Sequence, residues 1–305
     1  MTPILVLVPE ERGISALAQV PNVCAVVYDP ESRRLPDIAC DAEVLVAHRF
    51  DPADAGPLFA QLPRLRMVQL FSSGVERWTN VVPDGVRVSN ADRAHGGAVA
   101  EWVVAQLLAH VRDLAGYRIK QQEQRWQAHP TGTLSDKRVL VFGAGDIGEN
   151  LRRRLEPFGC TVTLVGRTAR AGVMDVERGR AELGDQDVVI LALPLDDSTV
   201  HLVDAVFLTT MKDGAVLVNA GRGELVDTEA LLAATREERV YAILDVTDPE
   251  PLPADHGLWT APGVVVTPHA AGITDDVRDR CWAAAVRKIA AYADGTDGSR
   301  VAVSR

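Results

Sequence analysis

Three polar residues of types that can act on a carbonyl group, Arg222, Glu250 and His269, each follow a short apolar run. The runs are rich in valine, leucine and isoleucine, which is typical of buried parallel strands. Loops beyond the carboxyl ends of neighbouring parallel strands face the same crevice. We therefore expect the guanidinium, the carboxylate and the imidazole to converge, although they are far apart in the sequence.

These three side chains together suit the reduction of a ketone next to a carboxylate. Protonated His269 can donate to the ketone oxygen as hydride reaches the carbon, and it takes the proton back in the reverse reaction. Glu250 can hold the other ring nitrogen and favour the imidazolium, while Arg222 can form a bidentate pair with the carboxylate. His269 lacks the spaced ligands of a metal site, so we expect no metal. Singly, the three could equally be a loop-packing histidine, a surface turn and a structural ion pair.

A glycine-rich turn indicates where the hydride donor would bind. Gly143, Gly145 and Gly148 form a G-x-G-x-x-G motif, with Asp146 and Ile147 inside it, between an apolar run and an amphipathic segment. That context is the dinucleotide-binding fingerprint. The glycines allow a tight turn and close approach of the pyrophosphate, and the helix N-terminus supplies N–H groups and partial positive charge.

The residues after the next apolar run, at 161–165, favour one cofactor. A site for NAD places an acid at the end of this strand, where it binds the adenosine ribose. Here the chain instead reads Gly166, Arg167, Thr168 and, two residues on, Arg170. A guanidinium can pair with a 2′-phosphate, so we predict NADP(H) as the preferred cofactor, with NAD(H) as a second option. The alternative is that both arginines are solvated loop charges.

Length and composition exclude several classes of protein. A chain of 305 residues with 47% hydrophobic residues is long enough for two packed domains. The net charge of −10 argues against nucleic acid or an anionic membrane as a partner. No signal peptide or membrane-spanning run is recognisable, so a cytoplasmic protein is expected. The widely spaced Cys24, Cys40, Cys160 and Cys281 are expected to be reduced, buried thiols.

Apolar runs alternate with helix-like segments along the whole chain, which predicts an α/β protein with two doubly wound parallel-sheet domains. We place a flavodoxin-like substrate domain at 1–97, with 273–305 returning to it. A Rossmann dinucleotide-binding domain follows at 98–272, containing six strands in succession.

Between these domains a long helix is expected over 98–114, followed by a polar connection over 117–127. A last helix over 275–293 carries apolar residues that could pack on the first domain. Trp102 and Trp126 are interpreted as packing residues.

At this point the chain resembles the D-isomer-specific 2-hydroxyacid dehydrogenases, a family that includes glyoxylate and hydroxypyruvate reductases. The resemblance covers nearly the whole length. The segments that carry it are 99–101, the glycine turn 143–148, 191–194 with Thr199, 219–223, Asp245, 250–251 and 268–272.

The family implies roles for particular residues. Arg222, Glu250 and His269 would be its catalytic set, and Asp245 would contact the nicotinamide carboxamide. Backbone N–H groups of Ser73, Gly74 and Val75 would bind the substrate carboxylate, and members usually dimerise through the cofactor domain. The remaining cofactor contacts are expected at Leu193, Pro194, Thr199, Asn219, Ala220 and Gly272.

Two strand-end residues of the first domain, His48 and Arg49, either face the substrate or are solvated, and Arg49 is included among the substrate-binding candidates. His95 is a further candidate pocket residue.

The leading interpretation is an oxidoreductase that interconverts small 2-oxo acids and D-2-hydroxy acids. A rival is a nucleotide-sensing, corepressor-like binding protein on the same scaffold, and a formate or phosphite oxidase is a more distant third.

Overall fold

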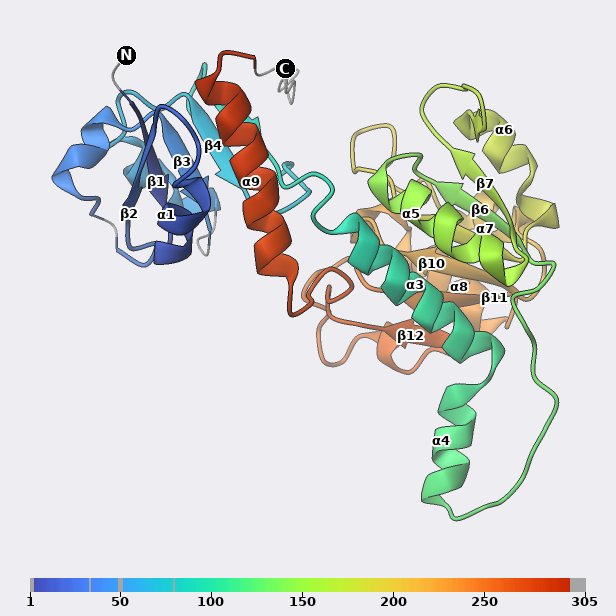
Figure 1. Cartoon of the computed structure of the whole chain (residues 1–305). Coiled ribbons are helices and arrows are strands. Elements are labelled where there is room, and N and C mark those ends of the chain that lie inside the picture. Colours follow the sequence, from blue (N-terminus) through green and yellow to red (C-terminus); the bar gives the residue numbers. More distant parts are fainter. Residues whose placement is uncertain (1–2, 33, 49–51, 79, 297–305) are drawn as a thin grey trace. The chain divides into compact units, whose positions relative to one another are not determined.

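The computed structural model describes residues 3–32, 34–48, 52–78 and 80–296, and the chain folds into two compact units (Figure 1). Unit 1 comprises Met1–His95 and Asp275–Arg305, and unit 2 comprises Gly96–Thr274. Assigning the substrate to unit 1 and the dinucleotide to unit 2 stays a prediction.

Unit 1 is built on a five-stranded parallel sheet in the order β2-β1-β3-β4-β5. Apolar side chains cover both faces of this sheet, as parallel sheets require. On one face α9 packs beside α1, burying Trp282 and Ile289. The elements are β1 (Ile4–Val8), α1 (Glu11–Leu17), β2 (Val23–Val27), β3 (Val44–Ala47), α2 (Gly56–Phe59), β4 (Met67–Leu70), β5 (Arg87–Ser89) and α9 (Val277–Ala293).

Unit 2 contains a seven-stranded parallel sheet in the order β12-β11-β10-β9-β6-β7-β8. The chain winds outward from β6 in one direction and from β9 in the other, which is the doubly wound dinucleotide-binding topology. The strands are β6 (Arg138–Phe142), β7 (Thr161–Val165), β8 (Val173–Met174), β9 (Val188–Leu191), β10 (Ala215–Asn219), β11 (Val240–Leu244) and β12 (Val264–Val266).

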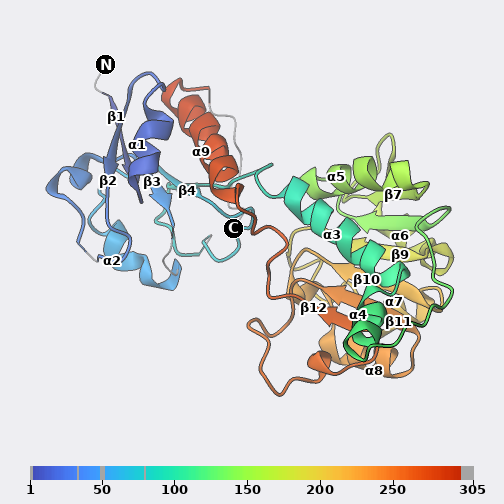
Figure 2. The ribbon, with the colours of Figure 1, turned by 60° about the horizontal axis from the view of Figure 1, so that its bottom comes forward.

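Helices cover both faces of this second sheet. The packed pair α3 (Gly96–Val111) and α5 (Asp146–Leu155) lies on one face, as Figure 2 shows. On the other face lie α6 (Val176–Ala181), α7 (Ala205–Thr210) and α8 (Thr228–Arg236). Short 3-10 helices complete the two units at Asp37–Asp41, Pro52–Asp54, Glu156–Phe158, Leu183–Asp185, Gly223–Leu225 and Gly257–Trp259.

The prediction of a polar connection over 117–127 is wrong as far as residue 122, because Leu114–Gln122 form a further helix, α4. The Asp113 side chain accepts a hydrogen bond from the Gly116 N–H and so caps this helix. None of its residues is buried, and α4 runs away from the unit 2 sheet (Figure 1) rather than packing on it.

Other differences concern exposure and short elements. Cys24 and Cys40 are exposed, contrary to expectation, whereas Cys160 and Cys281 are buried. Trp126, interpreted as a packing residue, is fully exposed in this single chain. The two-residue β8 was not anticipated, since so short a strand leaves no periodicity to read. Among the described residues, no helix is both long and apolar enough to cross a membrane.

Candidate functional site

Three loops at the carboxyl edge of the unit 2 sheet carry the predicted chemistry. They follow β10, β11 and β12, which are neighbours in the sheet, and they hold Arg222, Glu250 and His269 respectively. The first two loops pack directly on each other: a Cβ at Gly223 would lie 1.9 Å from the Thr247 carbonyl oxygen. Only glycine fits at that contact.

The loop of Arg222 is shaped by Asn219, which is 1% exposed. The Asn219 Nδ2 donates to the Arg222 carbonyl at 2.7 Å, and its Oδ1 accepts from the Gly221 N–H at 3.1 Å. Arg222 Nη1 in turn donates to the Gly221 carbonyl at 2.7 Å. Asn219 was expected to contact the cofactor. In the structure, both its Nδ2 and its Oδ1 form hydrogen bonds within its own loop.

Glu250 and His269 are in direct contact. The His269 Nδ1 lies 2.7 Å from Glu250 Oε1, which is hydrogen-bond distance, and the side chains are 50% and 44% exposed. A carboxylate on Nδ1 orients the ring. Because Glu250 occupies Nδ1, Nε2 is the ring nitrogen that could act on a substrate.

The backbone of His269 is strained and is held by Asp245. His269 has φ = 52°, in the left-handed region that non-glycine residues rarely adopt, at a typical cost of about 1–3 kcal/mol. Its N–H donates to the Asp245 carbonyl at 2.7 Å. Such a conformation persists only where its surroundings enforce it.

The Asp245 side chain, from a residue 4% exposed, provides that enforcement. Its Oδ1 accepts from Thr267 Oγ1 at 2.6 Å and from the Ala270 N–H at 2.8 Å, and its Oδ2 accepts from the Ala271 N–H at 2.9 Å. Asp245 was expected to contact a nicotinamide carboxamide. In the structure its carboxylate positions the histidine loop, a role that the sequence reasoning missed. Its contact with the nicotinamide stays a prediction.

The glycine turn after β6 fits a dinucleotide. A Cβ at Gly143, where φ is 125°, would lie 2.1 Å from the Ala192 carbonyl oxygen, and one at Gly148 would lie 2.0 Å from the Gly143 carbonyl oxygen. These two glycines are thus required for packing. At Gly145 a Cβ would meet no atom within 4 Å, which leaves space at the N-terminus of α5. Pyrophosphate binds in such a space.

Asp146 and Ile147, two further residues of the turn, face the interior of unit 2. Asp146 Oδ1 accepts from Asn150 Nδ2 at 3.0 Å, and its Oδ2 lies against Gly96 of α3. Ile147 packs on the core beneath α3 and α5. Any contribution of these two residues to anion binding therefore comes from their backbone N–H groups.

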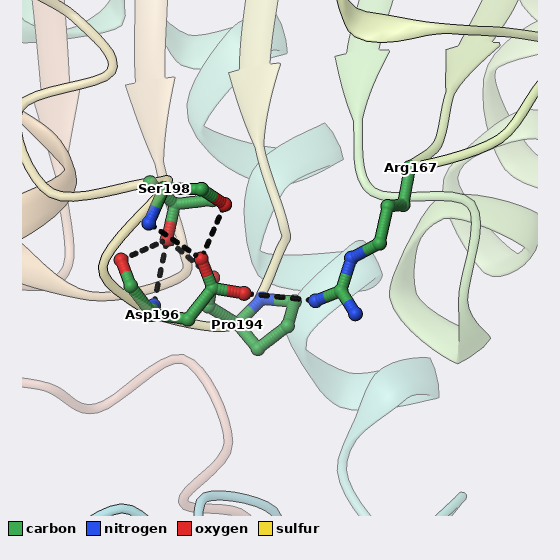
Figure 3. Close-up of polar contacts among 5 residues, drawn as sticks. Arg167, Pro194, Asp196 and Ser198 are labelled. Carbon is green, nitrogen blue, oxygen red and sulfur yellow. Dashed lines mark hydrogen bonds and ion pairs between the residues drawn. The ribbon is translucent and has the colours of Figure 1, made fainter. Parts of the chain in front are cut away.

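The two arginines after β7 have different partners. Arg170 Nη2 donates to the Ala144 carbonyl at 3.0 Å, and a Cβ at Gly166 would lie 3.3 Å from Arg170 Nη1. Positive charge therefore stands where the side chain of an NAD-binding acid would begin. Arg167, with its side chain 81% exposed, pairs with Asp196 at 2.8 Å (Figure 3). Thr168 is exposed on the same loop.

The loop after β9 is tied together by its own side chains. Thr199 Oγ1 accepts from the Asp196 N–H at 2.7 Å and donates to the Pro194 carbonyl at 3.1 Å. Leu193 packs on the core below. The remaining cofactor candidates are Ala220, partly buried in the loop after β10, and Gly272, at the end of the histidine loop.

In unit 1, Ser73, Gly74 and Val75 follow β4 in an irregular segment. Asn90 Nδ2 donates to the Ser73 carbonyl at 2.7 Å. In the described parts of the chain, no acceptor pairs with the backbone N–H groups of these three residues. Three unpaired donors in sequence are suited to a carboxylate.

The other candidates of unit 1 that the structure describes, His48 and His95, both contact Phe71, which directly follows β4. Arg49 is outside the described residues. His48 contacts Arg278 and packs at a tilt on Phe71. His95 Nε2 is 2.9 Å from the Phe71 carbonyl oxygen, so His95 is bonded inside unit 1. Within the described residues, no group of three His, Cys, Asp or Glu side chains could hold a metal ion.

Comparisons with known proteins support the same chemistry. The family model for the NAD binding domain of D-isomer specific 2-hydroxyacid dehydrogenases matches residues 104–271. A glyoxylate reductase of Aeropyrum pernix is 32% identical over 87% of this chain and 84% of its own length. An (S)-sulfolactate dehydrogenase of Chromohalobacter salexigens is 31% identical over 90% of this chain and 94% of its own length.

A solved structure resembles the whole chain. The D-isomer specific 2-hydroxyacid dehydrogenase of Xanthobacter autotrophicus, in complex with NADPH and MES, superposes with a TM-score of 0.83 at 28% identity. The match covers 97% of this chain and 96% of that one. With the family model spanning more than half of the sequence, this chain belongs to the D-isomer specific 2-hydroxyacid dehydrogenase family and is an NAD(P)-dependent oxidoreductase.

Proposed function

We propose that the chain reduces small 2-oxo acids to D-2-hydroxy acids and, in the reverse direction, oxidises D-2-hydroxy acids to 2-oxo acids. NADP(H) is the preferred cofactor. The observation that carries the proposal is the contact of 2.7 Å between His269 and Glu250, on the same sheet edge as the glycine turn. Relatives that act on glyoxylate and sulfolactate support a small acid substrate.

The bound nicotinamide supplies or accepts the hydride. His269 donates a proton from Nε2 to the ketone oxygen, and Glu250 on Nδ1 stabilises the imidazolium before the transfer. Arg222 pairs with the substrate carboxylate and polarises the adjacent carbonyl. Asp245 keeps the His269 loop in its strained conformation.

The preference for NADP(H) rests on the end of β7. Gly166 replaces the acid of an NAD site, Arg170 stands beside it, and Arg167 extends from the same loop. A 2′-phosphate accepts charge-assisted hydrogen bonds from such guanidinium groups, each contributing about 1.5–3 kcal/mol.

The direct test measures the absorbance of NADPH and of NADH at 340 nm with a panel of 2-oxo acids. We expect turnover with at least one small 2-oxo acid and a higher kcat/KM with NADPH. Tight nucleotide binding without turnover of any acid would contradict the proposal and favour the nucleotide-sensing alternative.

The same proposal includes a homodimer formed through unit 2. The supporting observation is that Leu114, Ile119 and Trp126 are exposed on α4 and on the chain after it. Together these segments form an arm that extends from unit 2 (Figure 1). Apolar side chains of this kind commonly mark an interface. Light scattering after size-exclusion chromatography should give a dimer for the native chain and a smaller mass for Trp126→Ser. A monomeric native chain would refute this part.

A further inference from the structure

The loop after β9 places an acidic side chain against one of the two cofactor-selecting arginines. Asp196 Oδ2 accepts a hydrogen bond from Arg167 Nη2 at 2.8 Å, and the two residues come from loops 29 positions apart in the sequence (Figure 3). The contact joins the ends of β7 and β9, which flank β6 and its glycine turn in the sheet.

The two sides of this ion pair differ in mobility. The Asp196 Oδ1 accepts from the Ser198 N–H at 3.0 Å and from Ser198 Oγ at 2.5 Å, so its loop orients the carboxylate. Arg167 is a long side chain and is 81% exposed, so it can move at little cost. Asp196 therefore sets where the guanidinium lies when no other anion competes for it.

The carboxylate is ionised throughout the neutral range. The Ser198 hydroxyl hydrogen bond and, to a smaller extent, the charge of Arg167 hold the pKa of Asp196 below its usual value, against the opposing effect of partial burial. A 2′-phosphate carries a charge of about −1.5 to −2 near neutral pH. Bound at Arg167, it would meet a second negative charge competing for the same guanidinium.

We propose that Asp196 is a specificity-determining residue that limits the preference for NADPH over NADH by competing with the 2′-phosphate for Arg167. The proposal rests on the proposed function, in which Arg167 binds that phosphate. Arg170 differs, because its guanidinium donates to the neutral Ala144 carbonyl and keeps its full charge for the phosphate. Discrimination then depends on one arginine that is paired with a carboxylate and one that is hydrogen-bonded to a neutral carbonyl.

The substitution Asp196→Asn tests this competition with little change of shape. An asparagine oxygen can still accept from Ser198, whereas the amide group facing Arg167 carries no charge. Asp197→Asn is the matched control, because Asp197 is an exposed neighbour in the same loop and loses the same charge. Dissociation constants are measured by isothermal titration calorimetry for NADPH, NADH, 2′,5′-ADP and 5′-AMP, so the readout is independent of turnover.

We expect Asp196→Asn to bind NADPH and 2′,5′-ADP about three- to tenfold more tightly, as removal of a competing exposed charge predicts. NADH and 5′-AMP should change by less than about twofold, and the gain should shrink at high salt. In Asp197→Asn the change should stay below about twofold for every ligand. Adding Arg167→Ala to Asp196→Asn should remove the gain.

Unchanged or weaker NADPH binding in Asp196→Asn, or an equal gain in Asp197→Asn, would overturn the inference. Both results would leave the proposed function intact as long as Arg167→Ala still weakens NADPH more than NADH. Equal losses for the two cofactors in Arg167→Ala would instead refute the phosphate role of Arg167, and with it this inference. The proposed reduction of 2-oxo acids would still be decided by the turnover test.

Discussion

The two ends of the functional edge of unit 2 are built differently. At the β11–β12 end, the nearly buried Asp245 accepts three side-chain and backbone donors and holds the His269 loop. At the β7–β9 end, the contact between Arg167 and Asp196 joins side chains that are 81% and 36% exposed. The first end is held by the buried carboxylate of Asp245, and we call it the anchored end. The second end, which we call the exposed end, depends on the mobile side chain of Arg167 at the surface.

The difference matches what each end is proposed to do. Proton transfer requires donor and acceptor to be held within hydrogen-bond distance, and small misplacements are costly to the rate. Charge attraction to a phosphate tolerates several side-chain positions. We therefore expect substitutions at the anchored end to affect turnover strongly, and those at the exposed end to affect mainly the choice of cofactor.

The largest effect is expected for His269→Ala, which removes the proton donor. Turnover should fall about 10²- to 10⁴-fold, the range typical of a general acid or base. Cofactor affinity, measured by titration, should stay nearly unchanged, because the imidazole is not among the phosphate-binding groups. Substantial activity in this variant would reject the acid–base role.

Asp245→Asn should give the next largest effect. The amide cannot accept from all three donors, so an N–H of the His269 loop loses its partner, at about 1–3 kcal/mol of unfolding free energy. We also expect kcat to fall about 10- to 100-fold as the loop loosens. Asp248→Asn, in the same loop after β11, is the control and should retain near-native melting and activity.

The same change made at the exposed end should cost far less stability. Asp196→Asn should lower the unfolding free energy by no more than about 1 kcal/mol, since exposed ion pairs contribute little. Melting temperatures of the two Asp→Asn variants therefore separate the two ends directly. Equal destabilisation would contradict the contrast between them.

Glu250→Gln should lower kcat by roughly tenfold, because a neutral amide supports the imidazolium less well than a carboxylate. The KM for the 2-oxo acid should change little, since Glu250 acts on His269 and not on the substrate carboxylate. A variant that raised KM alone would place Glu250 in substrate binding instead.

The smallest effect on turnover is expected for Arg167→Ala. Loss of a charge-assisted hydrogen bond should weaken NADPH about tenfold while NADH stays within about twofold. Saturating NADPH should restore kcat. Reduced kcat at saturation would mean that the exposed end also positions the nicotinamide.

Some features followed from local pattern. Alternating apolar runs and amphipathic segments predicted both parallel sheets, and the G-x-G-x-x-G context placed the glycine turn at the start of α5. The strand-end positions of Glu250 and His269 correctly suggested that they would meet. These inferences succeed for two reasons. Burial of one face of an element spaces its apolar residues at regular intervals in the sequence, and the carboxyl ends of parallel strands lie at the same edge of the sheet.

The sequence alone therefore determined the fold class and the position of the glycine turn, and it suggested the residue types that are proposed to react. Only the tertiary structure decided that Asp245 holds the histidine loop, that Asp196 pairs with Arg167, and that α4 is a helix standing away from the sheet. The reason is physical. The spacing of apolar residues along the sequence indicates which face of a segment is buried. The partner of a polar side chain depends instead on strand order and on the geometry of loops that are distant in the sequence.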